Sequence, residues 1–94
     1  MNTEFEWDPI KAASNQEKHG VSFIEAATVF FDSLSVTVSD PVHSVDEQRF
    51  VITGVSYQHR ALVVVHLDRG VRIRLISARL ATPAERKKYE SGPQ

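Results

Sequence analysis

Three apolar segments in the second half of the chain constrain the fold more than any other feature. Residues 49–55, 61–67 and 71–77 are rich in β-branched residues and are joined by turns of only a few residues. Short turns of this kind connect neighbouring antiparallel strands. In the second turn, residues 68–70, a glycine stands where a three-residue hairpin needs a positive φ. The sequence therefore predicts an antiparallel meander.

Two helices are expected ahead of the meander. The first runs to about residue 19, with Asp8 as N-cap, proline at the first helical position, and Gly20 after its end in the left-handed region. The second begins with the capping box Ser22–Glu25. Its apolar residues recur at helical spacing and form one stripe toward the core: Phe23, Ala26, Ala27 and Phe30.

Two short strands and one more helix complete the pattern. Residues 5–7 alternate as a first strand, and residues 34–39 alternate as a half-buried strand. A polar loop then runs through Glu47. Thr82–Glu85 is a second capping box with proline at the first helical position, and its helix ends before Gly92.

The resulting order of elements is β-α-α-β-β-β-β-α. Helices segregated from a mostly antiparallel sheet define an α+β domain, here with two N-terminal helices on one face and a C-terminal helix. Because 94 residues suffice for one modest hydrophobic core, we expect residues 1–94 to form a single domain.

Charge is distributed unevenly along the chain. The net charge is −1, but residues 1–68 carry four basic and ten acidic side chains, whereas residues 69–94 carry seven basic and two acidic ones. A basic segment on an acidic chain creates a local positive surface that suits phosphate groups. The alternative is a solubilising charged tail.

The composition favours a cytoplasmic protein without membrane association. The first residues are acidic and lack the apolar segment of a signal peptide, and no apolar run approaches the roughly 20 residues that span a bilayer. There is no cysteine, so disulfides and thiolate chemistry are excluded.

The last predicted strand carries two arginines on one side. Arg72 and Arg74 share a face and form a possible platform for phosphate oxygens, although a solvated strand face has the same pattern. The other face is apolar: Val71, Ile73 and Leu75. Strict alternation would turn Arg79 toward the core. Therefore either the strand ends or bulges near residues 77–78, or Arg79 reaches an inner carboxylate.

The final helix brings a carboxylate and a phenol together. Glu85 and Tyr89 are four residues apart and share a face, beside the cations of residues 86–88. Such a set can act as acid and base. The alternative is that Glu85 only completes the capping box and Tyr89 only packs.

The four histidines do not have the spacing of metal ligands, so we expect no metal site. We also expect no cofactor, because glycine-rich phosphate loops and dinucleotide fingerprints are absent. His66 lies inside an apolar strand and is expected to be structural. His19 ends a helix, where a cation complements the macrodipole, but histidine also suits proton transfer near neutral pH.

Ordered residue clusters along nearly the whole chain resemble the BrnT-type toxins. In the N-terminal half these are Phe5–Pro9, Asn15, Lys18–Phe23, Glu25-Ala26 and Val29-Phe30, continued by Asp40, His43-Ser44, Glu47 and Arg49. In the C-terminal half they are Arg74, Ile76–Arg79, Ala81-Thr82, Glu85-Arg86 and Tyr89-Glu90. Leu80 departs from the pattern, because the family often has a basic residue there.

The resemblance implies a RelE-like fold and a ribonuclease that is the toxin of a bacterial type II toxin–antitoxin module. It also implies a partner, a BrnA-type antitoxin with a ribbon-helix-helix DNA-binding part. The two proteins of such a pair form a heterotetramer that represses its own operon, so the toxin would meet operator DNA only through the antitoxin.

A ribonuclease without metal needs a base for the 2′-hydroxyl, an acid for the leaving 5′-oxygen, and cations for the phosphate. On this hypothesis Arg74 and Arg79 hold the scissile phosphate, and Lys18 adds charge. Three side chains compete for the acid and base roles: His19, Glu85 and Tyr89. Further RNA contacts are assigned to four arginines: Arg49, Arg60, Arg72 and Arg86. Cleavage of RNA would then inhibit translation.

A non-catalytic interaction module is the alternative function. Its basic C-terminal end would dock on an acidic protein, which the same charge asymmetry also supports.

Overall fold

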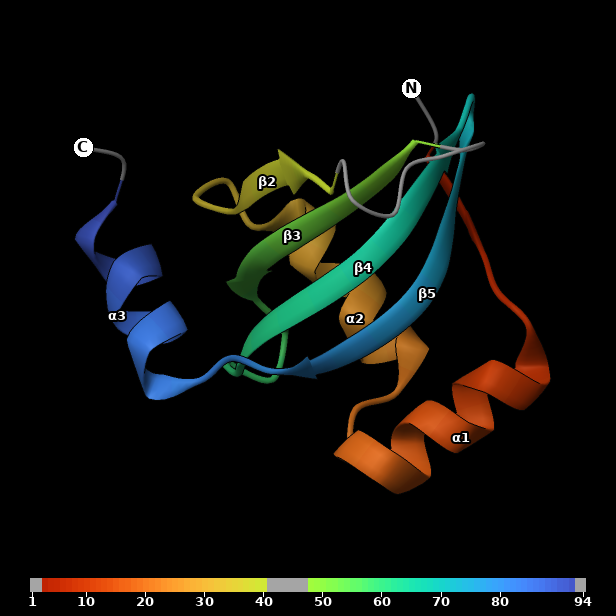
Figure 1. Ribbon diagram of the computed structural model, residues 1–94, viewed down its shortest axis with the longest axis horizontal. Helices are drawn as coiled ribbons and strands as arrows, with labels where there is room; N and C mark the ends of the chain where they lie inside the picture. Colours follow the sequence, from red (N-terminus) through yellow and green to blue (C-terminus); the bar gives the residue numbers. More distant parts are fainter. Residues whose placement is uncertain (1–2, 41–47, 93–94) are drawn as a thin grey trace.

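The computed structural model describes residues 3–40 and 48–92, which form three α-helices, one 3₁₀ helix and a five-stranded sheet. The elements in chain order are β1 (Glu4–Glu6), α1 (Pro9–His19), α2 (Phe23–Thr28), the 3₁₀ helix η1 (Val29–Phe31), β2 (Val36–Ser39), β3 (Arg49–Val55), β4 (Ala61–Arg69), β5 (Arg72–Leu80) and α3 (Pro83–Ser91). The predicted α+β class and order of elements are confirmed (Figure 1). The loop predicted over residues 41–47 lies outside the described residues.

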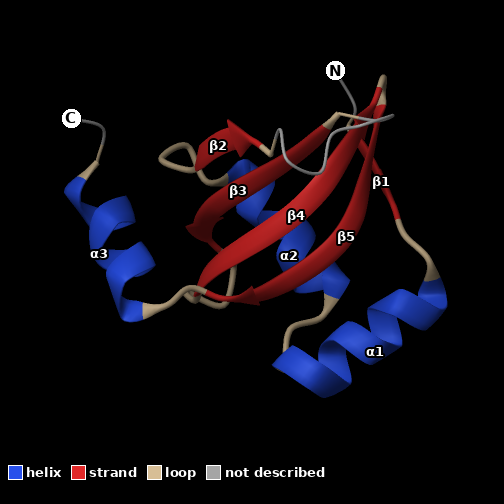
Figure 2. Ribbon diagram, viewed as in Figure 1, coloured by secondary structure: helices blue, strands red, loops and turns tan. Residues whose placement is uncertain are grey.

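The sheet has helices on one face only. Its strand order is β1-β5-β4-β3-β2, with β1 parallel to β5 and the other pairs antiparallel. As predicted, α1 and α2 cover one face, whereas α3 stands beside the sheet (Figure 2). We call the uncovered side the open face. The core between helices and sheet consists of Val21, Phe23, Ala26, Val29, Ile52, Leu62, Val64, Leu75 and Ala78.

The ends of α1 are those that the sequence predicts. Asp8 Oδ1 accepts a hydrogen bond from a backbone amide of the first turn at 2.8 Å, and Gly20 follows the helix with a φ of 69°. The buried side chain of Asn15 then fixes the helix to the sheet, because it bonds both the N–H and the carbonyl of Ala78 as well as the carbonyl of Val21. Among the described residues, no helix is long and apolar enough to cross a membrane.

The capping box predicted for α2 is only half formed. Ser22 Oγ accepts the amide of Glu25 at 3.0 Å, but the Glu25 carboxylate does not return to Ser22. It turns inward to Arg60 and Ser56 instead. The reciprocal bond is wrongly predicted because an inward cation and a hydroxyl compete for the carboxylate. The α-helix ends at Thr28 and continues as η1.

β2 is exposed, not half-buried as its alternation predicts. It forms one edge of the sheet, and in the register with β3 its Thr37 lies opposite the buried Ile52. Thr37 therefore points to the helix-covered side of the sheet, whereas Val36 and Val38 lie on the open face. The predicted period is correct, but the apolar side chains face away from the core. The strand also begins two residues later than predicted.

A β-bulge in β5 sets the direction of Arg79. Val65 and His66 are consecutive in β4 and pair with Ser77 and Leu75. Ile76 is therefore an extra residue in β5 without a partner in this register. As a result, Leu75 and Ala78 are both buried against the helices. Arg79 lies on the open face. Of the predicted alternatives, the bulge is present, one residue earlier than expected.

The turn between β4 and β5 is tighter than predicted. Arg69 pairs with Arg72, so only Gly70 and Val71 form the turn. Gly70 has a φ of 72°, as its predicted role requires. Val71 was expected to face the core but is exposed, because it lies in the turn. β5 extends to Leu80, three residues beyond its predicted end.

Candidate active site at the end of β5

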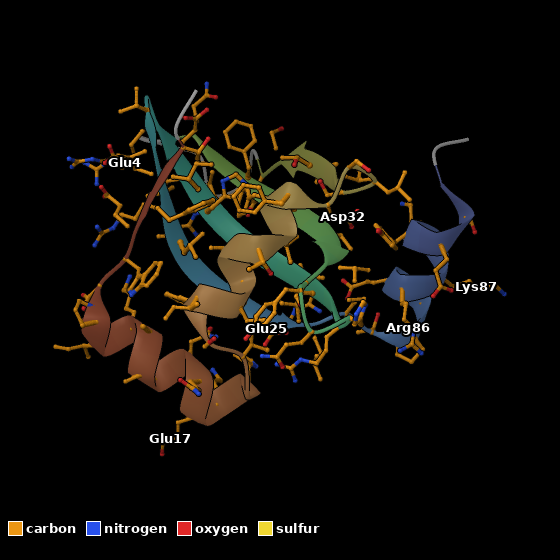
Figure 3. All side chains as sticks on the ribbon, turned by 180° about the vertical axis from the view of Figure 1, so that it is seen from behind. Glu4, Glu17, Glu25, Asp32, Arg86 and Lys87 are labelled. Carbon is orange, nitrogen blue, oxygen red and sulfur yellow. The ribbon has the colours of Figure 1, made fainter. Side chains whose placement is uncertain are left out.

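The arginines at the start of β5 face the glutamates of β1. Because the two strands are parallel and in register, Glu4 lies beside Arg72 and Glu6 beside Arg74 on the open face. Arg72 Nε is 3.4 Å from Glu4, and Arg74 Nη1 is 3.1 Å from Glu6. Arg69 also reaches Glu6, at 3.5 Å. We call these five residues the β1–β5 cluster; Figure 3 labels its Glu4.

The Arg72–Glu4 pair is weak because water reaches both side chains, whereas Arg74 and Glu6 are less exposed, at 31% and 25%. The side chains of Arg72 and Glu4 are 59% and 62% exposed. Exposed pairs of this kind contribute about 0–1 kcal/mol. A phosphate group can therefore replace a carboxylate at small cost, and three arginines against two glutamates leave a positive charge. The cluster is suited to attract a phosphate without fixing its orientation.

The end of β5 holds a more constrained pair. Arg79 donates from Nη1 and Nη2 to the two carboxylate oxygens of Glu85, at 2.7 and 2.9 Å. Glu85 Oε1 also accepts the amide of Thr82 at 2.8 Å, and Thr82 Oγ1 accepts the amide of Glu85 at 3.1 Å. This is the predicted capping box of α3. The helix start and the arginine therefore fix the same carboxylate.

These contacts set the protonation state of Glu85. The hydrogen bond from Arg79, together with the amide of Thr82, lowers the pKa of Glu85 to about 2. The carboxyl group is therefore ionised at neutral pH and cannot donate a proton there. It is also a weak base, because general-base catalysis is most effective with a pKa near the working pH.

Tyr89 bonds to Asp32, which the sequence patterns do not single out. The phenol O–H donates to Asp32 Oδ2. Asp32 also accepts the backbone amides of Leu34 at 2.9 Å and Val55 at 2.8 Å. Burial and the bond to Asp32 raise the pKa of Tyr89 to about 12. The pKa of Asp32 is lowered, since the hydrogen bonds from Tyr89 and the two amides outweigh the opposing effect of burial.

A glycine explains why Asp32 can lie against β3. A Cβ atom on Gly54 would be 2.9 Å from Val29 and 3.1 Å from Asp32 Oδ2, so only glycine admits this close approach. The bond from the amide of Leu34 to Asp32 is a local aspartate turn that a sequence pattern can indicate. The contact with Tyr89 joins residues 57 positions apart, which no local pattern indicates.

Arg60, a candidate for RNA contact, is bound within the protein. Its Nε donates to Glu25 at 2.9 Å, and its Nη2 donates to Glu25 and to the carbonyl of Gly20 at 3.1 Å. Glu25 is only 2% exposed and also accepts from Ser56 Oγ at 2.7 Å. The hydrogen bond from Arg60 lowers the pKa of Glu25. This network joins the β3–β4 turn to α1 and α2, where Figure 3 labels Glu25.

Lys18 and His19 lie at the exposed end of α1. They are at the same end of the sheet as Arg79, because the carbonyl of Gly20 accepts from Arg60, the residue before β4. However, α1 covers the helix side of the sheet, whereas Arg79 lies on the open face. A single ligand that contacts both would therefore have to pass around this end of the sheet.

Two of the remaining arginines lie away from that end, and Arg86 lies near it on α3, which follows β5. Arg49 and Arg74 are in register on either side of Leu67, so they lie on the open face about 10 Å apart. Arg74 is about 15 Å from Arg79 along β5. Arg86 is exposed on α3 (Figure 3). The predicted site residues thus form two groups, one at each end of β5.

His66 is buried in the core, as predicted. Its ring lies 4.8 Å from that of Phe30 and 5.7 Å from that of Phe50, and it is 5% exposed. Burial lowers its pKa. Within residues 3–40 and 48–92, no three side chains of the types His, Asp or Glu gather where they could hold a metal ion.

Comparison with known proteins identifies the family. The sequence profile of the family described as "Ribonuclease toxin, BrnT, of type II toxin-antitoxin system" matches residues 7–85. The chain belongs to the BrnT family. It is a ribonuclease toxin of the type II toxin–antitoxin class, as the resemblance implied, and this class implies an antitoxin partner. The matched segment includes Arg79 and Glu85 but ends before Arg86 and Tyr89.

A solved structure shows the same BrnT fold. The 1.1 Å crystal structure of the ribonuclease toxin BrnT from Brucella abortus matches with a TM-score of 0.63 and 21% sequence identity. The match covers 86% of this chain and 99% of that chain. At this identity the likeness concerns the fold. Among curated proteins, none matches the chain.

Proposed function

We propose that this BrnT protein is a metal-independent endoribonuclease that inhibits translation by cleaving RNA. The observation that carries the proposal is the match of the BrnT family to residues 7–85. The charge distribution supports an RNA substrate, since seven of the 11 lysines and arginines lie in residues 69–94.

We assign the charge on the scissile phosphate to Arg79. Glu85 already orients its guanidinium, and an oriented cation stabilises a transition state better than a mobile one. The described bonds to Glu85 and to the carbonyl of Leu80 use three of the five N–H donors of an arginine. Because about 15 Å separates Arg74 from Arg79, Arg74 is better placed to hold a neighbouring phosphate. Three further arginines would add RNA contacts in this scheme: Arg49, Arg72 and Arg86.

We assign one of the two proton transfers, at the 2′-hydroxyl or at the leaving 5′-oxygen, to His19, with Lys18 adding charge beside it; the other transfer is left to water. The pKa of Glu85 is about 2 and that of Tyr89 about 12, so neither suits proton exchange near neutral pH. Histidine is the residue type that enzymes most often use for proton transfer. In this scheme Glu85 positions Arg79, Tyr89 holds α3, and Arg60 acts through its support of the β3–β4 turn.

The proposed partner is a BrnA-type antitoxin with a ribbon-helix-helix part. Membership of a type II toxin family supports an antitoxin in general. The finer proposal is a cytoplasmic heterotetramer that neutralises the ribonuclease and binds operator DNA through the antitoxin.

The test is cleavage of a defined RNA by the purified, partner-free protein in excess EDTA. We expect the wild type and Lys11→Ala to cut, because Lys11 is exposed at the opposite end of α1 from Lys18 and His19. We expect Arg79→Ala to lose about 100-fold in rate or more. If EDTA abolishes cleavage by the wild type, the reaction depends on metal. If neither the wild type nor the variants cut RNA while folded, alone or with translating ribosomes, the chain is better explained as the non-catalytic interaction module.

A further inference from the structure

An apolar segment at one edge of the sheet is exposed. Leu34, Val36 and Val38 are 72%, 45% and 56% exposed, and Phe31 just before them is 76% exposed. β2 ends the strand order of the described sheet. The Phe31 ring packs toward Phe5 of β1, whereas Val36 and Val38 adjoin each other on the open face at β2. Exposed apolar side chains that adjoin at a sheet edge can mark an interface.

The backbone of β2 can accept another strand. Residues of an antiparallel strand alternately direct their N–H and carbonyl groups to one side and then the other. The amide of Asp40 donates to the carbonyl of Arg49 at 2.8 Å. The even-numbered residues of β2 therefore bond toward β3, and Thr37 and Ser39 direct their groups outward. An edge of this kind is a template for strand addition.

The charge around β2 favours a protein partner over RNA. Residues 19–48 contain neither lysine nor arginine. Nucleic-acid binding depends mainly on cations that contact phosphates, and those of this chain are concentrated in residues 69–88. Asp32 and Asp40 flank the strand, so a partner segment that carries lysine or arginine beside apolar residues is complementary to it.

We propose that the antitoxin docks here by adding an extended segment to the outer edge of β2. Its backbone pairs with Thr37 and Ser39, its apolar side chains cover Val36 and Val38, and its cations approach the flanking aspartates. The inference rests on the proposed antitoxin partner but not on the proposed chemistry. Because Arg79 lies on β5, three strands away, loss of this contact leaves cleavage intact.

Two sets of variants separate the backbone contribution from the side chains. Thr37→Pro removes an outward N–H and keeps the bonds to β3, since proline is tolerated where an edge N–H faces solvent. Thr37→Val keeps the N–H and is its control. The double variant Val36→Asp, Val38→Asp adds two negative charges to the patch, and the double variant Ile10→Asp, Ile24→Asp adds the same charge at exposed apolar residues of α1 and α2.

The probe is the purified protein encoded next to the gene of this chain, with binding measured by calorimetry beside RNA cleavage. We expect Thr37→Pro and the double variant to bind at least about ten-fold more weakly, whereas both controls bind and all variants cleave RNA like the wild type. Unchanged binding by both folded variants, or no binding by the wild type, overturns the proposal. The proposal is also overturned if the wild-type chain alone forms a dimer and the variants do not, because the edge of β2 would then bind a second copy of the chain. If the variants lose binding but no protein cleaves RNA, only the proposed ribonuclease activity fails.

Discussion

The two ends of β5 combine arginine and glutamate in different ways. At the start of the strand, Arg72 and Arg74 meet the glutamates of β1 through longer ion-pair contacts of 3.1 to 3.6 Å, and Arg74 makes one hydrogen bond to Glu6. At the end, Arg79 binds both oxygens of Glu85 at 2.7 and 2.9 Å. The same Glu85 is also fixed by the cap of α3.

The start of β5 provides positive charge, whereas the end of β5 provides a hydrogen-bond donor with a fixed orientation. The exposed Arg72–Glu4 pair can exchange its carboxylate for a phosphate, so the start of β5 supplies attraction. A guanidinium held by two parallel hydrogen bonds has a set direction, so the end of β5 supplies a prearranged donor. We infer that the first end binds RNA and the second acts on it.

The largest expected effect comes from removing the support under the end of β5. Arg60→Ala leaves the carboxylate of Glu25 buried without its cation, which should cost about 3 kcal/mol. For a domain of this size, the melting temperature should fall by about 12 °C or more in thermal unfolding followed by circular dichroism. Arg72→Ala, in the exposed cluster, is the control and should shift it by only a few degrees. A small shift for Arg60→Ala would show that this network does not support the site.

A smaller effect is expected where α3 is held to the body. No residue of α3 is buried, so the bond between Tyr89 and Asp32 contributes much of its attachment. Tyr89→Phe should lower the free energy of unfolding by about 1–2 kcal/mol and speed hydrogen exchange in α3. Tyr57→Phe, which changes an exposed phenol, is the control. Equal exchange in the two variants would contradict the role of this bond.

The pH dependence of stability tests the constrained pair directly. The pKa of Glu85 in the folded state is about 2, below its ordinary value of 4.5. Its contribution to stability is therefore complete above about pH 4.5 and is lost as the pH falls toward 2. In thermal melts, Glu85→Gln should have a lower melting temperature than the wild type at about pH 6. The difference between the two melting temperatures should disappear at about pH 2. A gap independent of pH would mean that the carboxylate charge is not what stabilises this corner.

The smallest effect is expected at the start of β5. Glu6→Gln removes a negative charge that lies within 3.6 Å of Arg69, Arg72 and Arg74. RNA affinity should rise by about two- to five-fold at low salt and less at high salt, measured by fluorescence anisotropy. Glu17→Gln, on the far side of α1 (Figure 3), makes the same change in charge and is the control. An equal rise in both variants would mean that only net charge matters.

Local signals made most of the fold predictable. Capping residues such as Asp8 and Thr82 bond within their own helix ends, and short turns require antiparallel neighbours, so both patterns are visible in the sequence. The exposed face of β2 was not predictable, because alternation gives a period and tertiary packing decides which side is covered. The bulge at Ile76 depends on the register with β4 and has no signature of its own.

The site was predictable only in part, for the same reason. The sequence places Arg79 and Glu85 at the junction of a strand and a helix, six residues apart, and the structure brings them together. Glu25 and Arg60 are 35 residues apart, and the sequence gives Glu25 a cap role that its inward partner overrides. Asp32 meets Tyr89 only because the chain folds back across the sheet.

The most direct test of the central claim compares two lysine substitutions. Lysine keeps the charge of an arginine but loses its planar fork. In single-turnover cleavage of a defined RNA in excess EDTA, Arg79→Lys should slow the reaction by about 100-fold, and Arg74→Lys by no more than about three-fold. If both substitutions slow cleavage equally, or Arg74→Lys slows it more, orientation at the end of β5 is not what drives the reaction.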